Sequence, residues 1–299
     1  MQFRVLALFA LLSFTSLPGP ASVHAEGLPF DTVFKGKPRF DSLVAQLKPK
    51  AAQLRGLPIG ERLAWFGRVF VGTPYKSYTL EIDDRVEAPS VNFTGLDCWT
   101  FFETALAFSR MVDEPEENWT PQTLLHYIEL DRYWGGRCTG SYLSRLHYLE
   151  DWLHDNDKRG LVQDLTRSLG GKGVPNSATE MTINWKNYRY MAASPSLRAG
   201  IAKVESRLRS SDLTMIPKSH VREIESQIQS GDIIGVISHD GDAYGTSHVG
   251  LAYRKDGVLH FMHASSPRNS GKVILDGRLS DYLARFPRDA GILVARPLK

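Results

Sequence analysis

Up to about residue 226, apolar residues along the chain recur at helical spacing. Within 99–112, Phe101, Ala105 and Phe108 lie three or four positions apart and would share one side of a helix. A side this apolar must be buried. The same spacing predicts helices over 41–54, 61–70, 99–112, 141–154 and 197–208.

From residue 227 onward, the pattern changes to short β-rich runs separated by Gly, Asp and Pro. Such runs are typical of strands joined by turns. They predict strands over 231–238, 247–254, 258–264 and 291–297, a further strand over 272–276 and a short helix near 279–286. A helix, an insertion and then an antiparallel sheet give an α+β fold class.

These patterns suggest a chain with one main domain. We expect a signal peptide over 1–25, an N-terminal helical lead-in over 26–60 and a single catalytic domain over 61–299. The core of that domain would comprise 61–112 and 227–299, interrupted by a large, mainly helical insertion over 113–226. Within the insertion, the composition of 169–180 predicts a loop.

The first residues have the pattern of a secretory signal. Arg4 precedes an apolar run over 5–14, and Val23-His24-Ala25 forms an A-x-A-like cleavage site. No later stretch approaches the ~20 apolar residues of a membrane helix. We therefore expect a periplasmic or secreted protein with no membrane contact after signal cleavage.

The composition argues against a nucleic-acid partner and bears on whether the cysteines are needed for stability. The chain has 36 basic and 33 acidic residues, and the basic residues are dispersed, which argues against nucleic-acid binding. With 299 residues and 42% hydrophobic composition, it can bury a full core without cross-links. Cysteine is therefore not needed for stability.

The two cysteines allow two interpretations. An oxidising compartment normally pairs its cysteines, so one disulfide between Cys98 and Cys138 is the simpler interpretation. Alternatively, Cys98 is a working thiol and Cys138 is incidental. Cys98 follows Asp97, the expected N-cap of the helix over 99–112. The free N–H groups of that helix start would stabilise a thiolate and could hold an oxyanion.

Two histidines are candidates for a base and its orienting partner. Strand alternation places His248, Gly250 and Ala252 on one face of the strand 247–254, and these small residues leave room for a helix N-terminus. On the next strand, His263 points opposite to His260. We therefore expect His248 as the base of Cys98, with His263 fixing the tautomer of His248.

Several separated motifs resemble a known family. "VGTPYKSY", "LDCWTFFE", "SGDIIGVI", "SHVGLAYR", "HFMHASS" and "GKVIL" occur in the order seen in the NlpC-type papain-like peptidoglycan hydrolases, the NlpC/p60 superfamily. The resemblance covers about 61–110 and 228–296. Trp99-Thr100-Phe101 replaces the usual Ser-Gly after Asp-Cys. Together with "YLSRLHYLEDW", this change resembles the N-acetylmuramoyl-L-alanine amidase-like branch.

The resemblance implies a papain-like core, in which a helix carries the nucleophile against an antiparallel sheet. It implies catalytic roles for Cys98, His248 and His263, with Tyr75 against the reaction centre. The implied activity is hydrolysis of the amide between N-acetylmuramic acid and L-alanine in peptidoglycan fragments, through a cysteine thioester and without metal or organic cofactor. The alternative within the superfamily is a γ-D-glutamyl-diamino acid endopeptidase.

Substrate choice is expected to lie in the insertion. Ser144, Arg145, Tyr148 and Asp151 would share a polar face of the helix predicted over 141–154. Arg145 would bind a stem-peptide carboxylate through two hydrogen bonds. The alternative is a solvated helix face with one salt bridge.

Two further interpretations stay open at the level of sequence. Cys98, His248 and His263 are acceptable zinc ligands, which would make the protein a zinc-dependent amidase, although the sequence has no H-E-x-x-H motif. A Cys98–Cys138 disulfide would instead fit a non-catalytic wall-binding module. Neither composition nor pattern indicates an oligomeric state.

Overall fold

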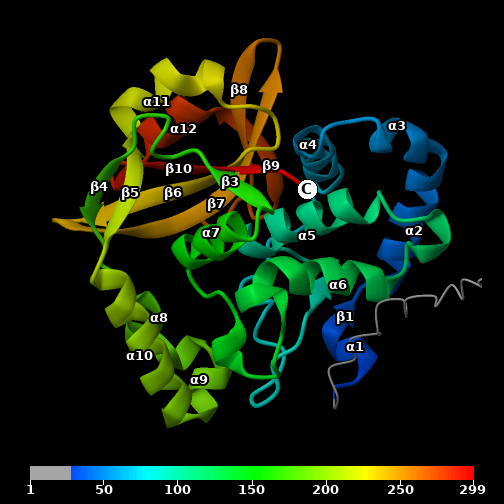
Figure 1. Ribbon diagram of the computed structural model, residues 1–299, viewed down its shortest axis with the longest axis horizontal. Helices are drawn as coiled ribbons and strands as arrows, with labels where there is room; N and C mark the ends of the chain where they lie inside the picture. Colours follow the sequence, from blue (N-terminus) through cyan, green and yellow to red (C-terminus); the bar gives the residue numbers. More distant parts are fainter. Residues whose placement is uncertain (1–27) are drawn as a thin grey trace, which may run out of the picture.

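The computed structural model describes residues 28–299, so the predicted signal peptide over 1–25 lies outside the described residues. Residues 28–299 form an α+β fold with one large antiparallel sheet and helices on both of its faces (Figure 1). Within this range, no helix combines the length and the apolar character that a membrane crossing requires.

The sheet has eight strands. Its order is β4-β5-β10-β6-β7-β8-β9, with β3 also paired to β10, and every pairing is antiparallel. The strands are β3 (Val162–Asp164), β4 (Lys172–Pro175), β5 (Asp212–Pro217), β6 (Ile233–Asp240), β7 (Ala243–Lys255), β8 (Val258–Ala264), β9 (Val273–Arg278) and β10 (Asp289–Pro297). The strands predicted beyond residue 227 are confirmed. A separate parallel pair joins β1 (Phe34–Lys35) to β2 (Val91–Asn92).

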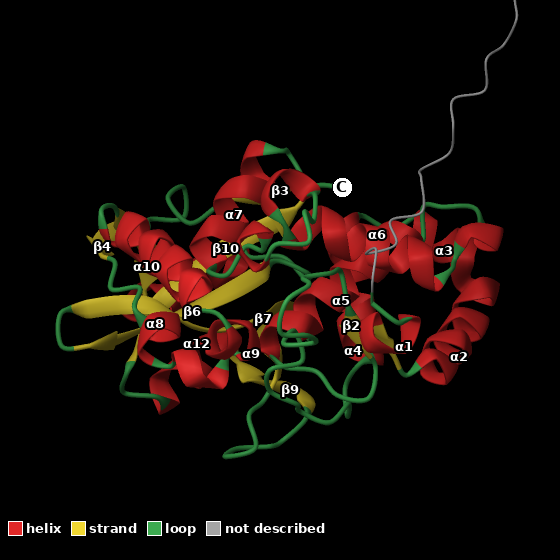
Figure 2. Ribbon diagram, turned by 90° about the horizontal axis from the view of Figure 1, so that it is seen from below, coloured by secondary structure: helices red, strands yellow, loops and turns green. Residues whose placement is uncertain are grey.

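The helices fall into groups that lie around the sheet. They are α1 (Phe30–Val33), α2 (Lys37–Leu47), α3 (Ala51–Arg55), α4 (Ile59–Val69), α5 (Cys98–Met111), α6 (Pro121–Arg132), α7 (Leu149–Lys158), α8 (Glu180–Ile183), α9 (Arg189–Ala193), α10 (Pro195–Arg209), α11 (Lys218–Ile224) and α12 (Leu279–Arg285). Figure 2 shows α1, α2 and α3 at one end of the molecule, and β4, α8 and α10 near the other. The predicted helices over 41–54, 61–70, 99–112 and 197–208 are confirmed as helical.

Each face of the sheet has its own core. Helices α4, α5 and α6 pack on one face, and every residue of α5 from Thr100 to Met111 is buried. Helices α11 and α12 cover the opposite face, where Val221 and Leu283 are buried. The apolar pattern of 99–112 therefore predicted the central helix correctly.

The alternation of β7 is present, but its two faces are exchanged relative to our expectation. Val249 and Leu251 share a core with α5, whereas Ala252 lies in the core beneath α12. A Cβ atom on Gly250 would come 2.7 Å from the Phe261 ring, so the small residues make room for that ring. The helix that carries Cys98 thus packs on the large-residue face of β7.

The middle section, 113–226, is less helical than predicted. It contributes β3, β4 and β5 to the central sheet, and both β3 and β5 pair with β10. Strand β4 lies inside the range 169–180, where the composition predicts a loop. The pattern missed β3 and β4 because they are only three and four residues long.

The helix predicted over 141–154 is wrong in its first half. A single 3-10 turn, Tyr142–Ser144, is followed by an extended residue, Arg145, which bridges to Tyr133. Helix α7 begins only at Leu149. The leucine spacing fits a helix, but the burial of Arg145 between carboxylates is a tertiary contact that overrides local preference.

Candidate active site

Cys98 is the first residue of α5, and a capping box fixes this helix start. The N–H of Thr100 donates to Asp97 Oδ1 at 2.8 Å, and the N–H of Asp97 donates to Thr100 Oγ1 at 3.0 Å. The role predicted for Asp97 as N-cap is confirmed. The cap holds the first turn of α5, and with it Cys98, in one orientation.

The sulfur of Cys98 lies where the start of α5 meets β7. Backbone N–H groups of Val249, Trp99 and Cys98 itself are directed at the sulfur and lower its pKa. Val249 is the residue after His248 on β7. The fold therefore brings the thiol to the strand segment that carries the expected base.

The thiol and the imidazole are both neutral in the free protein. Burial, reinforced by the charge of Asp97, raises the pKa of Cys98 to about 12. Burial, together with the neighbouring His263, lowers the pKa of His248 to about 3. The N–H groups at the helix start lower the pKa of Cys98, but by less than burial and Asp97 raise it. Both shifts favour the neutral forms of the two groups over the expected thiolate.

A chain of side chains leads away from His248. Its Nε2 lies 2.7 Å from Nδ1 of His263, and Nε2 of His263 lies 3.5 Å from Oδ2 of Asp276. Arg285 donates to the same Asp276 oxygen at 2.7 Å. The hydrogen bond to His263 and then Arg285 hold the pKa of Asp276 well below its usual range.

The charge of Asp276 fixes the tautomers along this chain. A carboxylate accepts only, so Nε2 of His263 carries the proton and Nδ1 of His263 accepts from Nε2 of His248. The Nδ1 atom of His248 is then unprotonated and can take a proton. The sequence reasoning missed Asp276, although the strand predicted over 272–276 ends on it.

Tyr75 lies in the same pocket as Cys98. The pocket has a volume of about 310 Å³. Two backbone contacts hold Tyr75: its N–H donates to the Gly271 carbonyl at 2.8 Å, and it bridges to Leu96, two residues before Cys98. Burial, with the neighbouring Cys98 and Asp97, raises the pKa of Tyr75, so its hydroxyl stays a donor.

Aromatic residues and a methionine from distant parts of the chain line this pocket, which we call the catalytic pocket. Trp99 comes from α5, Tyr78 from the preceding loop, and Met181 and Tyr188 from the middle section. The pattern gave no sign of Met181 or Tyr188, because the segments that carry them are short and irregular. The middle section thus forms one wall of the pocket, as expected, through residues that were not predicted.

Arg145 lines the catalytic pocket, but its guanidinium is already engaged. It is 4% exposed, lies 2.7 Å from Glu81 and 3.4 Å from Glu87, and stacks on Tyr142 at 4.6 Å. It also donates to the carbonyl of Leu80. These partners leave no free two-pronged donor, so the expected binding of a stem carboxylate by Arg145 has no support in this arrangement.

The other three residues predicted to bind substrate do not line the catalytic pocket. Ser144 donates to a carbonyl within its own turn. Tyr148 donates to Glu205 at 2.6 Å, and Asp151 pairs with Arg207 at 2.6 and 2.9 Å. The prediction grouped them on one helix face, and that helix begins only after Tyr148.

The geometry matches neither of the two alternative interpretations, the Cys98–Cys138 disulfide and the zinc site. Cys98 and Cys138 are both free, and Cys138 Sγ donates to the Glu87 carbonyl at 3.4 Å, so the disulfide is not formed. Across residues 28–299, no three His, Cys, Asp or Glu side chains are grouped so that they could hold a metal. His248 and His263 point their nitrogens at each other rather than at a common ion.

The chain is similar to one protein family and to several solved structures. A family model described as AmiA-like, N-acetylmuramoyl-L-alanine amidase-like, matches residues 65–292. An N-acetylmuramoyl-L-alanine amidase from Bacteroides uniformis superposes with a TM-score of 0.70 and 28% identity, over 81% of this chain and 99% of its own. No curated protein sequence matches.

Two further structures have the same architecture. A Bacteroides fragilis structure named "putative xylanase" superposes with a TM-score of 0.66 and 33% identity, over 78% of this chain and 99% of its own. A Legionella pneumophila protein superposes with a TM-score of 0.61 and 23% identity, over 87% of this chain and 95% of its own. At that identity, the second likeness concerns the fold alone.

Proposed function

The chain belongs to the AmiA-like, N-acetylmuramoyl-L-alanine amidase-like family, and from this premise we propose that it is a cysteine-dependent hydrolase. Its substrate would be the amide between the lactyl group of N-acetylmuramic acid and the L-alanine of muropeptides. The observation that carries the proposal is the approach of the Cys98 sulfur to the N–H of Val249, beside the base of the His248–His263 pair. We also propose export to the periplasm or beyond, and a papain-like NlpC/p60 core.

The first step forms a thioester. The thiol proton of Cys98 passes to Nδ1 of His248 as Sγ attacks the lactyl carbonyl. The resulting oxyanion accepts hydrogen bonds from the Cys98 N–H and the Tyr75 hydroxyl. One such donor contributes about 2.7–4 kcal/mol to transition-state stabilisation. His248 then protonates the alanine nitrogen, the C–N bond breaks, and the free stem peptide leaves.

The second step restores the enzyme. Water attacks the thioester carbonyl while His248 accepts its proton, and the C–S bond breaks to release the lactyl carboxylate. The proton held by His248 returns to the sulfur of Cys98. Since the resting pair is neutral, imidazolium forms only during turnover, and His263 with Asp276 stabilises it at that moment.

The other candidate activities have less support. A glycosidase needs two carboxyl groups on either side of the scissile bond. In the catalytic pocket, Asp97 caps α5, Glu81 is paired with Arg145, and Glu180 accepts from Tyr188 and Asn184, which leaves all three poorly placed for that chemistry. A γ-D-glutamyl endopeptidase would use the same Cys98 and His248, and only its products distinguish it.

One experiment tests the proposal and separates the two peptidoglycan activities. A defined disaccharide-tripeptide is incubated with the wild-type protein, Cys98→Ala and Cys138→Ala, and the products are identified by mass spectrometry. We expect free tripeptide from wild type and Cys138→Ala, and none from Cys98→Ala. Full activity in Cys98→Ala would overturn the cysteine mechanism. Release of the diamino acid instead of the tripeptide would reassign the cleaved bond.

A further inference from the structure

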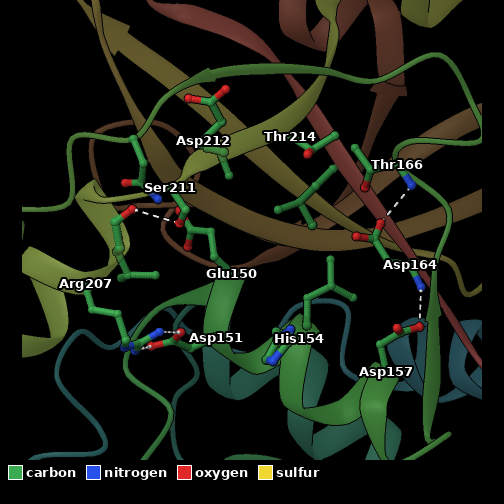
Figure 3. A pocket seen from close by; sticks show the side chains of 15 residues that line it. Glu150, Asp151, His154, Asp157, Asp164, Thr166, Arg207, Ser211, Asp212 and Thr214 are labelled. Carbon is green, nitrogen blue, oxygen red and sulfur yellow. Dashed lines mark hydrogen bonds and ion pairs between the residues drawn. The ribbon is translucent and has the colours of Figure 1, made fainter.

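A second pocket, lined by residues of α7, α10, β3 and β5, looks at first like an acidic site. Figure 3 shows this pocket of about 380 Å³, with carboxylates around its rim. Most are satisfied by the protein. Asp151 binds Arg207 through two hydrogen bonds, Asp164 accepts from the Thr166 N–H at 2.8 Å, and Asp157 accepts from the Asp164 N–H at 3.0 Å. The contacts of Asp151 and Asp157 join α7 to α10 and to β3, so these carboxylates have a structural role.

Glu150, in the first turn of α7, is different. Both of its carboxylate oxygens are shielded from solvent and have no hydrogen-bond partner among the described residues. The Oγ1 atom of Thr246, on β7, is likewise shielded from solvent and has no hydrogen-bond partner among the described residues. Burial raises the pKa of Glu150, and its own backbone N–H and the nearby Thr246 oppose that rise only in part. A buried carboxyl group without a partner is costly, which indicates that a ligand supplies the missing contact.

Glu150 and Thr246 meet in a small pocket next to the catalytic pocket. This side pocket, of about 190 Å³, is lined by Tyr148, Glu150, Ser177, Ala178, Thr179, Glu180, Gly245 and Thr246. Glu180 also lines the catalytic pocket that holds Cys98. Along β7, Thr246 precedes His248 by two residues, with a β-bulge between them in the pairing with β6.

The lining of the side pocket is acidic in composition. Its lining includes two carboxyl groups, on Glu150 and Glu180, and no Lys, Arg or His. An ammonium group has three donors and no acceptor. Within residues 28–299, the Glu150 carboxyl oxygens have no donor within hydrogen-bond distance, and the Thr246 hydroxyl beside them can accept as well as donate, so a primary ammonium would satisfy both.

We propose that the side pocket binds the free side-chain ammonium of the diamino acid in the stem peptide, and that Glu150 selects for it. This inference rests on the proposed amidase function. When the lactyl carbonyl lies at Cys98, the leaving peptide places its third residue on the order of 10 Å away, at ~3.3–3.6 Å per residue. The side pocket adjoins the pocket of Cys98 through Glu180, which lines both.

Binding is tested first, separately from catalysis. The probes are L-alanyl-γ-D-glutamyl-L-lysine and the same tripeptide acetylated on its lysine side chain, titrated calorimetrically into wild type, Glu150→Gln and Asp151→Asn. For wild type and Asp151→Asn, we expect a Kd about 10- to 100-fold lower for the free amine, as a charged hydrogen bond gives. Glu150→Gln should bind both peptides equally. Thr246→Val provides a second variant, with a smaller loss of preference.

Turnover then separates this inference from the proposed function. Disaccharide-tripeptides carrying the free or the acetylated lysine are cleaved, and kcat/KM is compared. Equal binding of the two tripeptides by wild type, or an unchanged preference in Glu150→Gln, would overturn the role of Glu150 even if the amide is cleaved. A binding preference without cleavage of the lactyl amide would leave the side pocket assigned and overturn the amidase function.

Discussion

The Nε2 atom of His248 lies 2.7 Å from the Nδ1 atom of His263, and Asp276 determines which of the two nitrogens carries the proton. The arrangement leaves Nδ1 of His248 unprotonated and able to accept a proton. A carboxylate thus acts on the nucleophile through two imidazoles in series. Each ring must hold one tautomer for the base to be available.

Removing the charge of Asp276 should slow the chemical step. In Asp276→Asn, the amide can present either oxygen or nitrogen to His263, so the tautomers are no longer fixed. We expect kcat for muropeptide hydrolysis to fall about 10- to 100-fold and KM to stay within about twofold. This is the typical effect of losing a residue that hydrogen-bonds and orients an active-site side chain. Steady-state kinetics measures both. The matched control is Arg285→Gln, whose guanidinium is half exposed and should matter less. An unchanged kcat in Asp276→Asn would contradict this role.

The neutral thiol should react slowly with alkylating agents. With the Cys98 pKa raised to about 12, the rate of iodoacetamide modification at that residue should rise about tenfold per pH unit from pH 6 to 10, without a plateau. The measurement uses Cys138→Ala, so that a single thiol is followed by mass spectrometry. A pH-independent rate below pH 8 would indicate a resting thiolate–imidazolium pair and contradict the neutral state.

Acid should destabilise the protein partly through His248. Its pKa is about 3 in the folded protein and returns to the ordinary histidine value of 6.5 on unfolding, so between these values the unfolded chain binds a proton that the folded protein excludes. The free energy of unfolding should therefore fall as pH drops from about 6.5 toward 3. Urea unfolding of wild type and His248→Gln across this range measures the effect. We expect a shallower decline in the variant; parallel curves would contradict it.

Arg145 should matter for stability before it matters for binding. Arg145→Ala leaves Glu81 and Glu87 buried without their cation, and loss of one partner of a buried pair costs about 3–5 kcal/mol. Chemical denaturation measures the loss. The control, Lys37→Ala, removes the exposed partner of the exposed Asp41 and should cost about 0–1 kcal/mol. Equal losses in the two variants would refute the structural role of Arg145.

Sequence reasoning predicted the parts of the fold that depend on local pattern. The start of α5 was predictable because Asp97 and Thr100 form a cap within four residues. His248 and His263 were brought together by strand alternation and by the pairing of β7 with β8. Both features depend on short-range geometry that a single sequence contains. The α+β class followed from the same patterns.

Features that depend on long-range contacts were not predictable. The extended segment at Arg145 exists because Glu81 and Glu87, about 60 positions earlier, hold its guanidinium. Asp276 became part of the site only through the pairing of β9 with β8. Met181 and Tyr188 reach the catalytic pocket from short, irregular segments of the middle section. No spacing rule relates these residues to Cys98.

Strand β10 follows in the sequence every strand that it joins. It borders β6 on one side, and β3 and β5 on the other. During synthesis, the middle section and the sheet that carries His248 are therefore joined at their strands only by the Asn176–Tyr244 bridge until β10 has been made. Contacts this distant in sequence slow folding. The nascent chain should stay open and accessible to chaperones for most of its elongation, and the catalytic centre should mature in one late event.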